Sequence, residues 1–121
     1  MGKTVLVLDD SASVRRLVVA TLQGAGYSVV EGEHGAEGLA ALDRSAVDAI
    51  VTDLNMPVMN GLDFVRAARR RPANRFTPIL MLTTETGEAK KQEGRAAGCT
   101  GWINKPVSPP TLLQVLARAV P

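Results

Sequence analysis

The chain is poor in aromatic residues and in cysteine. Of its 121 residues only 3% are aromatic although 45% are apolar, so its core must be built mainly from Ala, Val, Leu and Ile. The single cysteine, Cys99, excludes an internal disulfide framework and fits a reducing compartment. The length indicates one domain that is large enough to bury a core.

Long apolar runs are also missing. No stretch approaches the roughly 20 residues that span a bilayer, and the first four residues run directly into a predicted strand, which leaves no room for a signal peptide. Leu6 stands where an N-myristoylation motif needs Ser or Thr. We therefore expect a soluble, cytoplasmic protein without membrane insertion.

The net charge is small. The chain has fourteen lysines and arginines and twelve acidic residues, so its net charge is +2. This charge is too small to indicate a nucleic-acid-binding surface. Arg69, Arg70, Arg71 and Arg75 do cluster, but they follow a predicted helix, where cations complement exposed carbonyls. We interpret this cluster as a solvated helix end.

Apolar runs and amphipathic stretches alternate along the chain. Continuous apolar runs predict strands, and spacings of three and four residues predict helices, with Asn60 as the N-cap of the third helix. This pattern predicts a doubly wound α/β domain over 1–121. Because the last predicted helix ends with the chain, we expect no output domain. The predicted strands are 4–8, 27–30, 49–52, 78–82 and 101–103, and the predicted helices are 14–22, 36–42, 61–70, 88–97 and 111–120.

Polar side chains follow four of these strands. Asp9 and Asp10 follow the first strand, Asp53 the third, Thr83 the fourth and Lys105 the fifth. In open α/β sheets, ligands bind outside the carboxyl ends of the strands, where the strand order reverses. If the order is 2-1-3-4-5, the first and third strands are neighbours, and the three carboxylates share one crevice.

These residue types suit phosphoryl transfer with Mg²⁺. The metal prefers hard oxygen ligands and would relieve the repulsion among three carboxylates. A carboxylate can also accept a phosphoryl group, and Asp53 is our candidate because it lies at the centre. Lys105 would supply a positive charge and Thr83 a hydroxyl donor.

As a set, these motifs resemble the receiver domains of two-component response regulators. The resemblance covers nearly the whole chain and is strongest to the stand-alone chemotaxis regulators of that family. It implies a flavodoxin-like fold of five parallel strands and five helices. The residues that carry it are Asp9-Asp10, Asp53-Leu54-Asn55-Met56-Pro57, Gly61, Leu82-Thr83-Thr84-Glu85, Ala97 to Asn104 and Lys105-Pro106.

The resemblance also assigns metal ligands. Asp10 and Asp53 would bind Mg²⁺ directly together with the backbone carbonyl of Asn55, and Asp9 would contribute through water. Asp53 would take its phosphoryl group from a histidine kinase, and Lys105 would pair with that group.

Switching and dephosphorylation are assigned in the same way. Thr83 would move toward the phosphoryl group, and the aromatic residue at 102 would turn inward behind it. Asn55 and Glu85 match positions that tune self-dephosphorylation. The chain departs from the family at Trp102, usually Tyr or Phe, and an indole needs more room to turn inward. It departs also at Asn104, commonly apolar, and at Val107, often Phe.

Three classes of function fit these residues. The first is a binding module controlled by phosphorylation, which signals through the face formed by the fourth helix, fifth strand and fifth helix and has no activity on external substrates. Its downstream partner would be a flagellar motor switch protein; a phosphate sink or a phosphorelay intermediate would use the same site. The second class is a Mg²⁺-dependent phosphotransferase or phosphatase, and the third is a scaffold with a degenerate site. We favour the first.

Simpler interpretations exist for single residues. Asp10 and Ser11 also suit capping of the first predicted helix, which we take as a secondary role. Glu85 could complement a helix N-terminus. The only histidine, His34, has no nearby metal-binding partner and is expected at the surface.

Overall fold

The computed structural model describes residues 2–85 and 87–120, and within them strand and helix alternate. The predicted succession of five strands, each followed by a helix, is confirmed. The elements are β1 (Thr4–Leu8), α1 (Ala12–Gly24), β2 (Ser28–Gly32), α2 (Gly35–Arg44), β3 (Ala49–Asp53), α3 (Gly61–Arg69), the short 3-10 helix η1 (Pro72–Asn74), β4 (Ile79–Thr83), α4 (Glu88–Ala97), β5 (Gly101–Asn104) and α5 (Pro109–Ala119).

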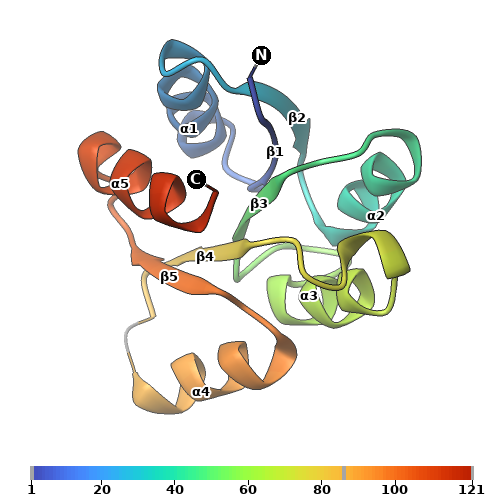
Figure 1. Cartoon of the computed structure of the whole chain (residues 1–121). Helices are drawn as coiled ribbons and strands as arrows, with labels where there is room; N and C mark the ends of the chain where they lie inside the picture. The colour runs from blue at the N-terminus through green and yellow to red at the C-terminus, as the bar shows by residue number, and fades with distance from the viewer. Residues whose placement is uncertain (1, 86, 121) are drawn as a thin grey trace.

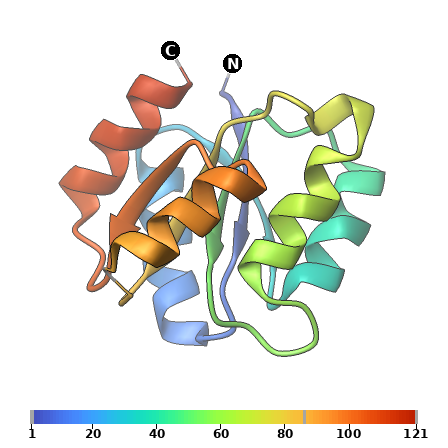
Figure 2. The same cartoon turned by 90° about the horizontal axis from the view of Figure 1, so that it is seen from below.

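The strands form one parallel sheet in the order β2-β1-β3-β4-β5, as predicted. Figure 1 shows α1 and α5 on one face of the sheet and α2, α3 and α4 on the other, and Figure 2 shows the same layers from below. The order reverses between β1 and β3, which pair with Leu8 opposite Thr52. The fold is therefore doubly wound and flavodoxin-like, with its switch point between these two strands.

Two aliphatic layers, one on each face of the sheet, hold the helices in place. Side chains alternate along β1, so Val5 and Val7 pack under α1 and α5, while Leu6 and Leu8 pack under α2 and α3. Burying one such side chain contributes about 1.5–3 kcal/mol. Phe64 is the one aromatic side chain that is fully buried among the described residues. The core is thus built from aliphatic residues, as the composition predicts.

Helix ends account for the main differences from the predicted bounds. α5 begins at Pro109 rather than at Thr111, because proline is tolerated in the first turn of a helix, where its missing N–H has no helical acceptor. α2 begins one residue earlier than predicted, at Gly35, since the Nδ1 atom of His34 caps it by accepting from the Glu37 N–H at 3.3 Å, and it continues to Arg44 rather than to Leu42. Asn60 caps α3 as predicted.

The interpretation of the arginine cluster as a solvated helix end is wrong for Arg69. Its guanidinium is half-buried and donates to the carbonyls of Gly98 at 2.7 and 3.1 Å, of Asn74 at 2.8 Å and of Thr77 at 2.6 Å. Burial lowers the pKa of Arg69 from its usual value. This side chain ties α3 to η1, to the start of β4 and to the end of α4. Its neighbour Arg70 is exposed, as predicted.

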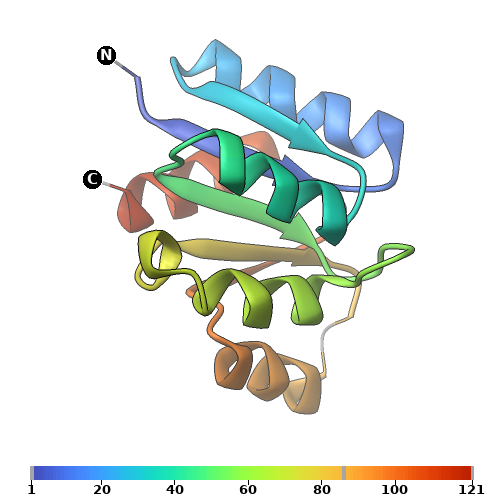
Figure 3. The same cartoon turned by 90° about the vertical axis from the view of Figure 1, so that its right-hand side faces the viewer.

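Figure 3 shows the strands from the side, with both termini at the amino ends of the strands. The carboxyl ends of β1, β3 and β4 meet at the opposite edge. The hydrogen bonds of Arg69 lie away from that edge, because its acceptor Thr77 comes just before the first residue of β4. Within residues 2–85 and 87–120, no helix has the length and apolarity needed to cross a membrane.

Candidate functional site

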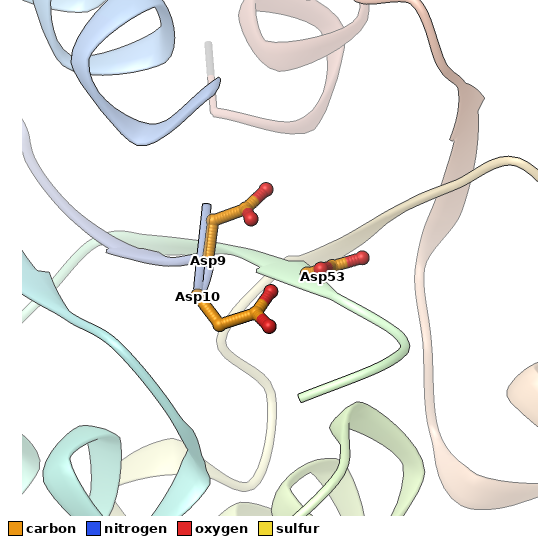
Figure 4. A group of neighbouring side chains, drawn as sticks. All are labelled: Asp9, Asp10 and Asp53. Atoms are coloured by element: carbon orange, nitrogen blue, oxygen red, sulfur yellow. The ribbon is translucent and has the colours of Figure 1, made fainter. Parts of the chain in front are cut away.

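Three carboxylates converge at the switch point, as predicted. Asp9 and Asp10 directly follow β1, and Asp53 is the last residue of β3. Each offers a carboxylate oxygen, and these oxygens lie within 4.8 Å of one another. Figure 4 shows the three side chains gathered between the ends of the two strands. Asp9 and Asp53 are buried whereas Asp10 is exposed, so the cluster opens to solvent on the side of Asp10.

Backbone hydrogen bonds hold two of these carboxylates. One oxygen of Asp9, Oδ1, accepts from the Ser11 N–H at 2.9 Å, and Oδ1 of Asp53 accepts from the Leu54 N–H at 2.8 Å. Gly61 lets the loop after β3 fold back closely, because a side chain there would collide with the Asp53 carbonyl. Ser11 also caps α1, accepting from the Val14 N–H at 3.4 Å.

Lys105 joins the cluster from the end of β5. Its Nζ atom lies 3.1 Å from Oδ2 of Asp9 and 3.2 Å from Oδ1 of Asp53. Its backbone N–H donates to the Thr83 carbonyl at 2.8 Å, which fixes the loop beside β4. The Lys105-Pro106 peptide bond is cis. Burial disfavours the ammonium, but Asp53 and Asp9 outweigh that cost, so the pKa of Lys105 is raised.

The electrostatics of Asp53 set it apart from an ordinary carboxyl group. Burial, together with the nearby Asp9 carboxylate, raises the pKa of Asp53 from 3.8 to about 6, although Lys105 and the Leu54 N–H oppose the rise. One ammonium does not compensate three adjacent carboxylates. The site therefore carries excess negative charge when its carboxylates are ionised.

The donor set fits a hard divalent cation. All three groups offer carboxylate oxygens, the ligands that Mg²⁺ prefers. Oδ2 of Asp9 is buried, lies 3.1 Å from the Lys105 ammonium, and has no hydrogen bond of good geometry among the described residues. A buried carboxylate oxygen of this kind is costly unless an ion or hydrogen bond engages it. The metal site predicted from the sequence is thus chemically consistent with the structure.

Thr83, Asn55 and Glu85 lie together beside the acidic cluster. The buried Thr83 hydroxyl accepts from the Glu85 N–H at 3.0 Å. The Asn55 side chain donates to the Glu85 carboxylate at 3.2 Å. Asn55 itself is exposed at the rim of the site. The role of its backbone carbonyl as a metal ligand stays a prediction.

Trp102 on β5 reaches the same segment. Its indole N–H donates to the Glu85 carbonyl at 3.3 Å, and its half-buried ring packs against the layer under α4. A side chain at Gly94 in α4 would collide with the six-membered ring of the indole. Gly94 therefore supplies the room that a tryptophan needs at this position. Glu85 connects three of the predicted functional residues, Asn55, Thr83 and Trp102.

The sequence interpretation missed two residues at this site, Arg15 and Gly94. Arg15 donates to the backbone carbonyl of Asp9 at 2.6 Å. A cation near the N-terminus of a helix opposes the helix dipole, and this unfavourable placement is a signal that the residue has a specific partner. A glycine inside a helix costs about 1 kcal/mol relative to alanine, and it signals a close approach.

Comparisons with known proteins agree with this geometry. The sequence matches the family model of the response regulator receiver domain over residues 5–117, and the chain belongs to that family. Chemotaxis protein CheY1 of Helicobacter pylori is 42% identical over 113 residues, which cover 92% of this chain and 91% of that protein.

Solved structures show the same likeness. The chemotaxis response regulator CheY4 of Vibrio cholerae is 51% identical, with a TM-score of 0.94 and coverage of 98% of this chain and 99% of that one. A receiver domain of a sensor histidine kinase from Pseudomonas aeruginosa is 26% identical, with a TM-score of 0.91 and coverage of 99% and 98%. That structure has a magnesium ion coordinated in its active-site cleft. The chain is thus a CheY-like receiver domain, as its motifs indicated.

Proposed function

We propose that this protein is a stand-alone response regulator that accepts a phosphoryl group on Asp53 from a histidine kinase and signals through altered partner binding. The observation that carries this proposal is the convergence of three carboxylates and Lys105 at the switch point, in a chain that is CheY-like over nearly its whole length. The cytoplasm, where its kinase and target would be available, is the proposed location.

Asp9, Asp10 and Asp53 would hold Mg²⁺, with the Asn55 carbonyl as a further ligand. The ion would neutralise the carboxylates and the phosphoryl oxygens so that the two anions can approach each other. The oxygen-only donor set supports this assignment, as does the buried Asp9 oxygen that has an ion pair but no hydrogen bond among the described residues. The magnesium in the related Pseudomonas aeruginosa domain supports it as well.

Asp53 is the proposed nucleophile. Its carboxylate oxygen forms a bond to phosphorus while the bond from phosphorus to the kinase imidazole nitrogen breaks, and that nitrogen keeps the electron pair. An imidazole protonated on its other nitrogen then leaves as the neutral ring. Lys105, 3.2 Å from Asp53, would pair with the transferred group. With its pKa raised to about 6, Asp53 is still mostly ionised at neutral pH.

Activity on external substrates is not part of this proposal. Turnover would be confined to hydrolysis of the Asp53 acyl phosphate, tuned by Asn55 and Glu85, whose side chains bond to each other at the rim of the site. A phosphotransferase or phosphatase would need an additional acid or base. The only histidine, His34, instead caps α2.

The signal would leave through α4, β5 and α5. The Thr83 hydroxyl and the Trp102 indole both hydrogen-bond to the backbone of Glu85, just before α4. Movement of Thr83 toward the phosphoryl group would therefore displace Glu85 and change the positions of Trp102 and α4. Reversing a 1:99 population requires about 5.5 kcal/mol. Two or three charge-assisted hydrogen bonds of about 1.5–3 kcal/mol each would supply it.

A flagellar motor switch protein is the proposed target, because the chain is similar to chemotaxis regulators. A phosphate sink or a relay intermediate would use the same acceptor site. Binding of motor switch protein to the beryllofluoride-treated chain separates these roles: the proposal expects affinity to rise on treatment, whereas a sink or relay protein would show no such rise.

Acetyl phosphate and mass spectrometry test the acceptor. In Mg²⁺ the parent should gain the mass of one phosphoryl group, on the peptide that contains Asp53, and should gain none after Mg²⁺ is chelated. Asp53→Asn should remain unmodified, while the control Asp63→Asn, which alters an exposed carboxylate on α3, should react as the parent does. Modification of Asp53→Asn at the parent rate would show that the acceptor is another residue.

A further inference from the structure

Arg15 links α1 to the acidic cluster. Its guanidinium donates through one terminal nitrogen to the Asp9 carbonyl at 2.6 Å and through Nε to the Glu31 carboxylate at 3.2 Å. Its side chain is only 17% exposed although it belongs to a surface helix. Two fixed partners on different segments hold this side chain in one orientation.

The partner of this guanidinium is the peptide group between Asp9 and Asp10. The orientation of that peptide sets the directions in which the two carboxylates leave the backbone. The Asp9 N–H donates to the Gly32 carbonyl of β2 at 3.2 Å. Arg15 binds the Asp9 carbonyl, so both backbone polar groups of Asp9 are held. Because Glu31 also belongs to β2, the bridge ties α1, the Asp9-Asp10 turn and β2 together.

We propose that Arg15 is a positioning residue for the divalent cation: it holds the Asp9-Asp10 peptide so that both carboxylates face the metal position, and Glu31 holds Arg15. This inference rests on the proposed function, since it deepens the metal site described there. A residue that does not touch the metal but holds a metal ligand in position also affects metal affinity. Replacing such a residue typically lowers the affinity 10–100-fold.

The sign of the effect separates positioning from simple electrostatics. Removing a positive charge near a cation site should strengthen cation binding, and screening limits that gain to about twofold. Losing the hold on the Asp9-Asp10 peptide should weaken binding instead. Arg16 is the matched control, because it is the next residue on α1, carries the same charge and is exposed.

The experiment measures the Mg²⁺ dissociation constant by calorimetry and by Trp102 fluorescence for the parent, Arg15→Met, Arg15→Lys and Arg16→Met. We expect Arg15→Met to bind about tenfold more weakly and Arg16→Met to bind as the parent does or slightly more tightly. Arg15→Lys should fall between the parent and Arg15→Met, since an ammonium keeps the charge but lacks the fork that reaches two partners.

A second pair of variants guards against misfolding of Arg15→Met. Glu31→Gln leaves Arg15 in place but replaces its charged partner by a neutral, weaker acceptor, whereas Glu33→Gln removes the same charge from an exposed neighbour. Glu31→Gln should weaken Mg²⁺ binding clearly more than Glu33→Gln does. Combining Arg15→Met with Glu31→Gln should add little to Arg15→Met alone, because both changes act on the same bridge.

The outcomes distinguish this inference from the proposed function. If the parent itself binds no Mg²⁺, the metal site and with it the proposed function fail. If the parent binds Mg²⁺ but Arg15→Met binds as tightly as Arg16→Met, or Glu31→Gln as tightly as Glu33→Gln, the positioning role is overturned while the metal site stands.

Discussion

Two regions of the described structure that bury charge differ in how well that charge is satisfied. Near the amino ends of the strands, the Arg69 guanidinium donates to three backbone carbonyls. At the carboxyl ends, a single ammonium, Lys105, faces the buried carboxylates of Asp9 and Asp53, and one oxygen of Asp9 lacks a hydrogen bond among the described residues. The first arrangement is complete as it stands, whereas the second is suited to a ligand.

This difference teaches which buried charges serve the fold and which serve the function. A satisfied buried charge is costly to remove, because its partners lose their hydrogen bonds. A buried charge that is crowded by like charges and lacks hydrogen bonds already lowers the free energy of unfolding. Removing such a charge should therefore raise the stability of the fold, although it would abolish the proposed phosphoryl transfer. Trading stability for activity in this way is a recurrent property of active sites.

The largest effect on stability is expected for Arg69→Met. The carbonyls of Gly98, Asn74 and Thr77 would lose their donor, and the free energy of unfolding should fall by about 3–5 kcal/mol. Chemical denaturation measures this loss, and the exposed Arg70→Met should change stability by less than about 0.5 kcal/mol. Equal effects of the two variants would mean that Arg69 is no structural tie.

Asp53→Asn should act in the opposite direction. The pKa of Asp53 rises from 3.8 to about 6 on folding because of burial and of Asp9, which corresponds to about 3 kcal/mol. Below pH 3.8 both the folded and unfolded states hold the proton. Between pH 3.8 and pH 6 the Asp53 carboxyl group keeps its proton in the folded state but loses it in the unfolded state. The stability of the metal-free protein therefore falls as pH rises through this range, and the loss is complete above pH 6.

The metal-free Asp53→Asn variant should therefore be more stable than the parent at pH 7 by up to about 3 kcal/mol, and its stability should vary less between pH 4 and pH 6. Denaturation of both proteins in a chelator at several pH values checks this. A variant that is less stable than the parent at pH 7 would contradict the interpretation of the site as a strained, unsatisfied cluster.

Gly94→Ala tests the packing behind the switch. The added methyl group would collide with the Trp102 ring, and overpacking costs about 1–3 kcal/mol, partly offset by about 1 kcal/mol of helix propensity. We expect a small net loss of stability and a red-shifted Trp102 emission as the indole leaves the Glu85 carbonyl. Gly87→Ala, whose added methyl group would meet no atom within 4 Å, should leave the emission unchanged.

A small effect on stability is also expected for Thr83→Ala, which removes one hydrogen bond to the Glu85 N–H and costs about 1 kcal/mol. Phosphorylation of Asp53 should persist, but partner affinity should respond weakly, because Thr83 would no longer report the modification. The exposed neighbour Thr84→Ala is the control. Partner binding by phosphorylated Thr83→Ala at the parent affinity would show that the signal travels by another route.

The sequence predicts the sheet and the acidic cluster because both follow from local rules. Continuous apolar runs define the strands, and parallel strands bring the residues after their carboxyl ends to one edge. Asp9, Asp53 and Lys105 therefore come together although they are far apart in the chain.

Contacts that depend on side-chain reach were not predicted. Periodicity places Arg69 at a helix end, but it does not reveal that the guanidinium turns toward carbonyls on other elements. The same holds for Arg15 and the Asp9 carbonyl, and for Gly94 beneath Trp102. In each of these cases the partner lies on another element, and only the packed structure identifies it.

The central claim is that the acidic cluster binds metal and phosphoryl group and is coupled to Trp102. The most direct test follows Trp102 fluorescence while Mg²⁺ and then beryllofluoride, an acyl-phosphate mimic, are added to the parent and to Asp53→Ala. We predict a Mg²⁺-dependent response to beryllofluoride in the parent that is absent in Asp53→Ala. An equal response in both proteins, or none in a parent that acetyl phosphate modifies at Asp53, would contradict this coupling.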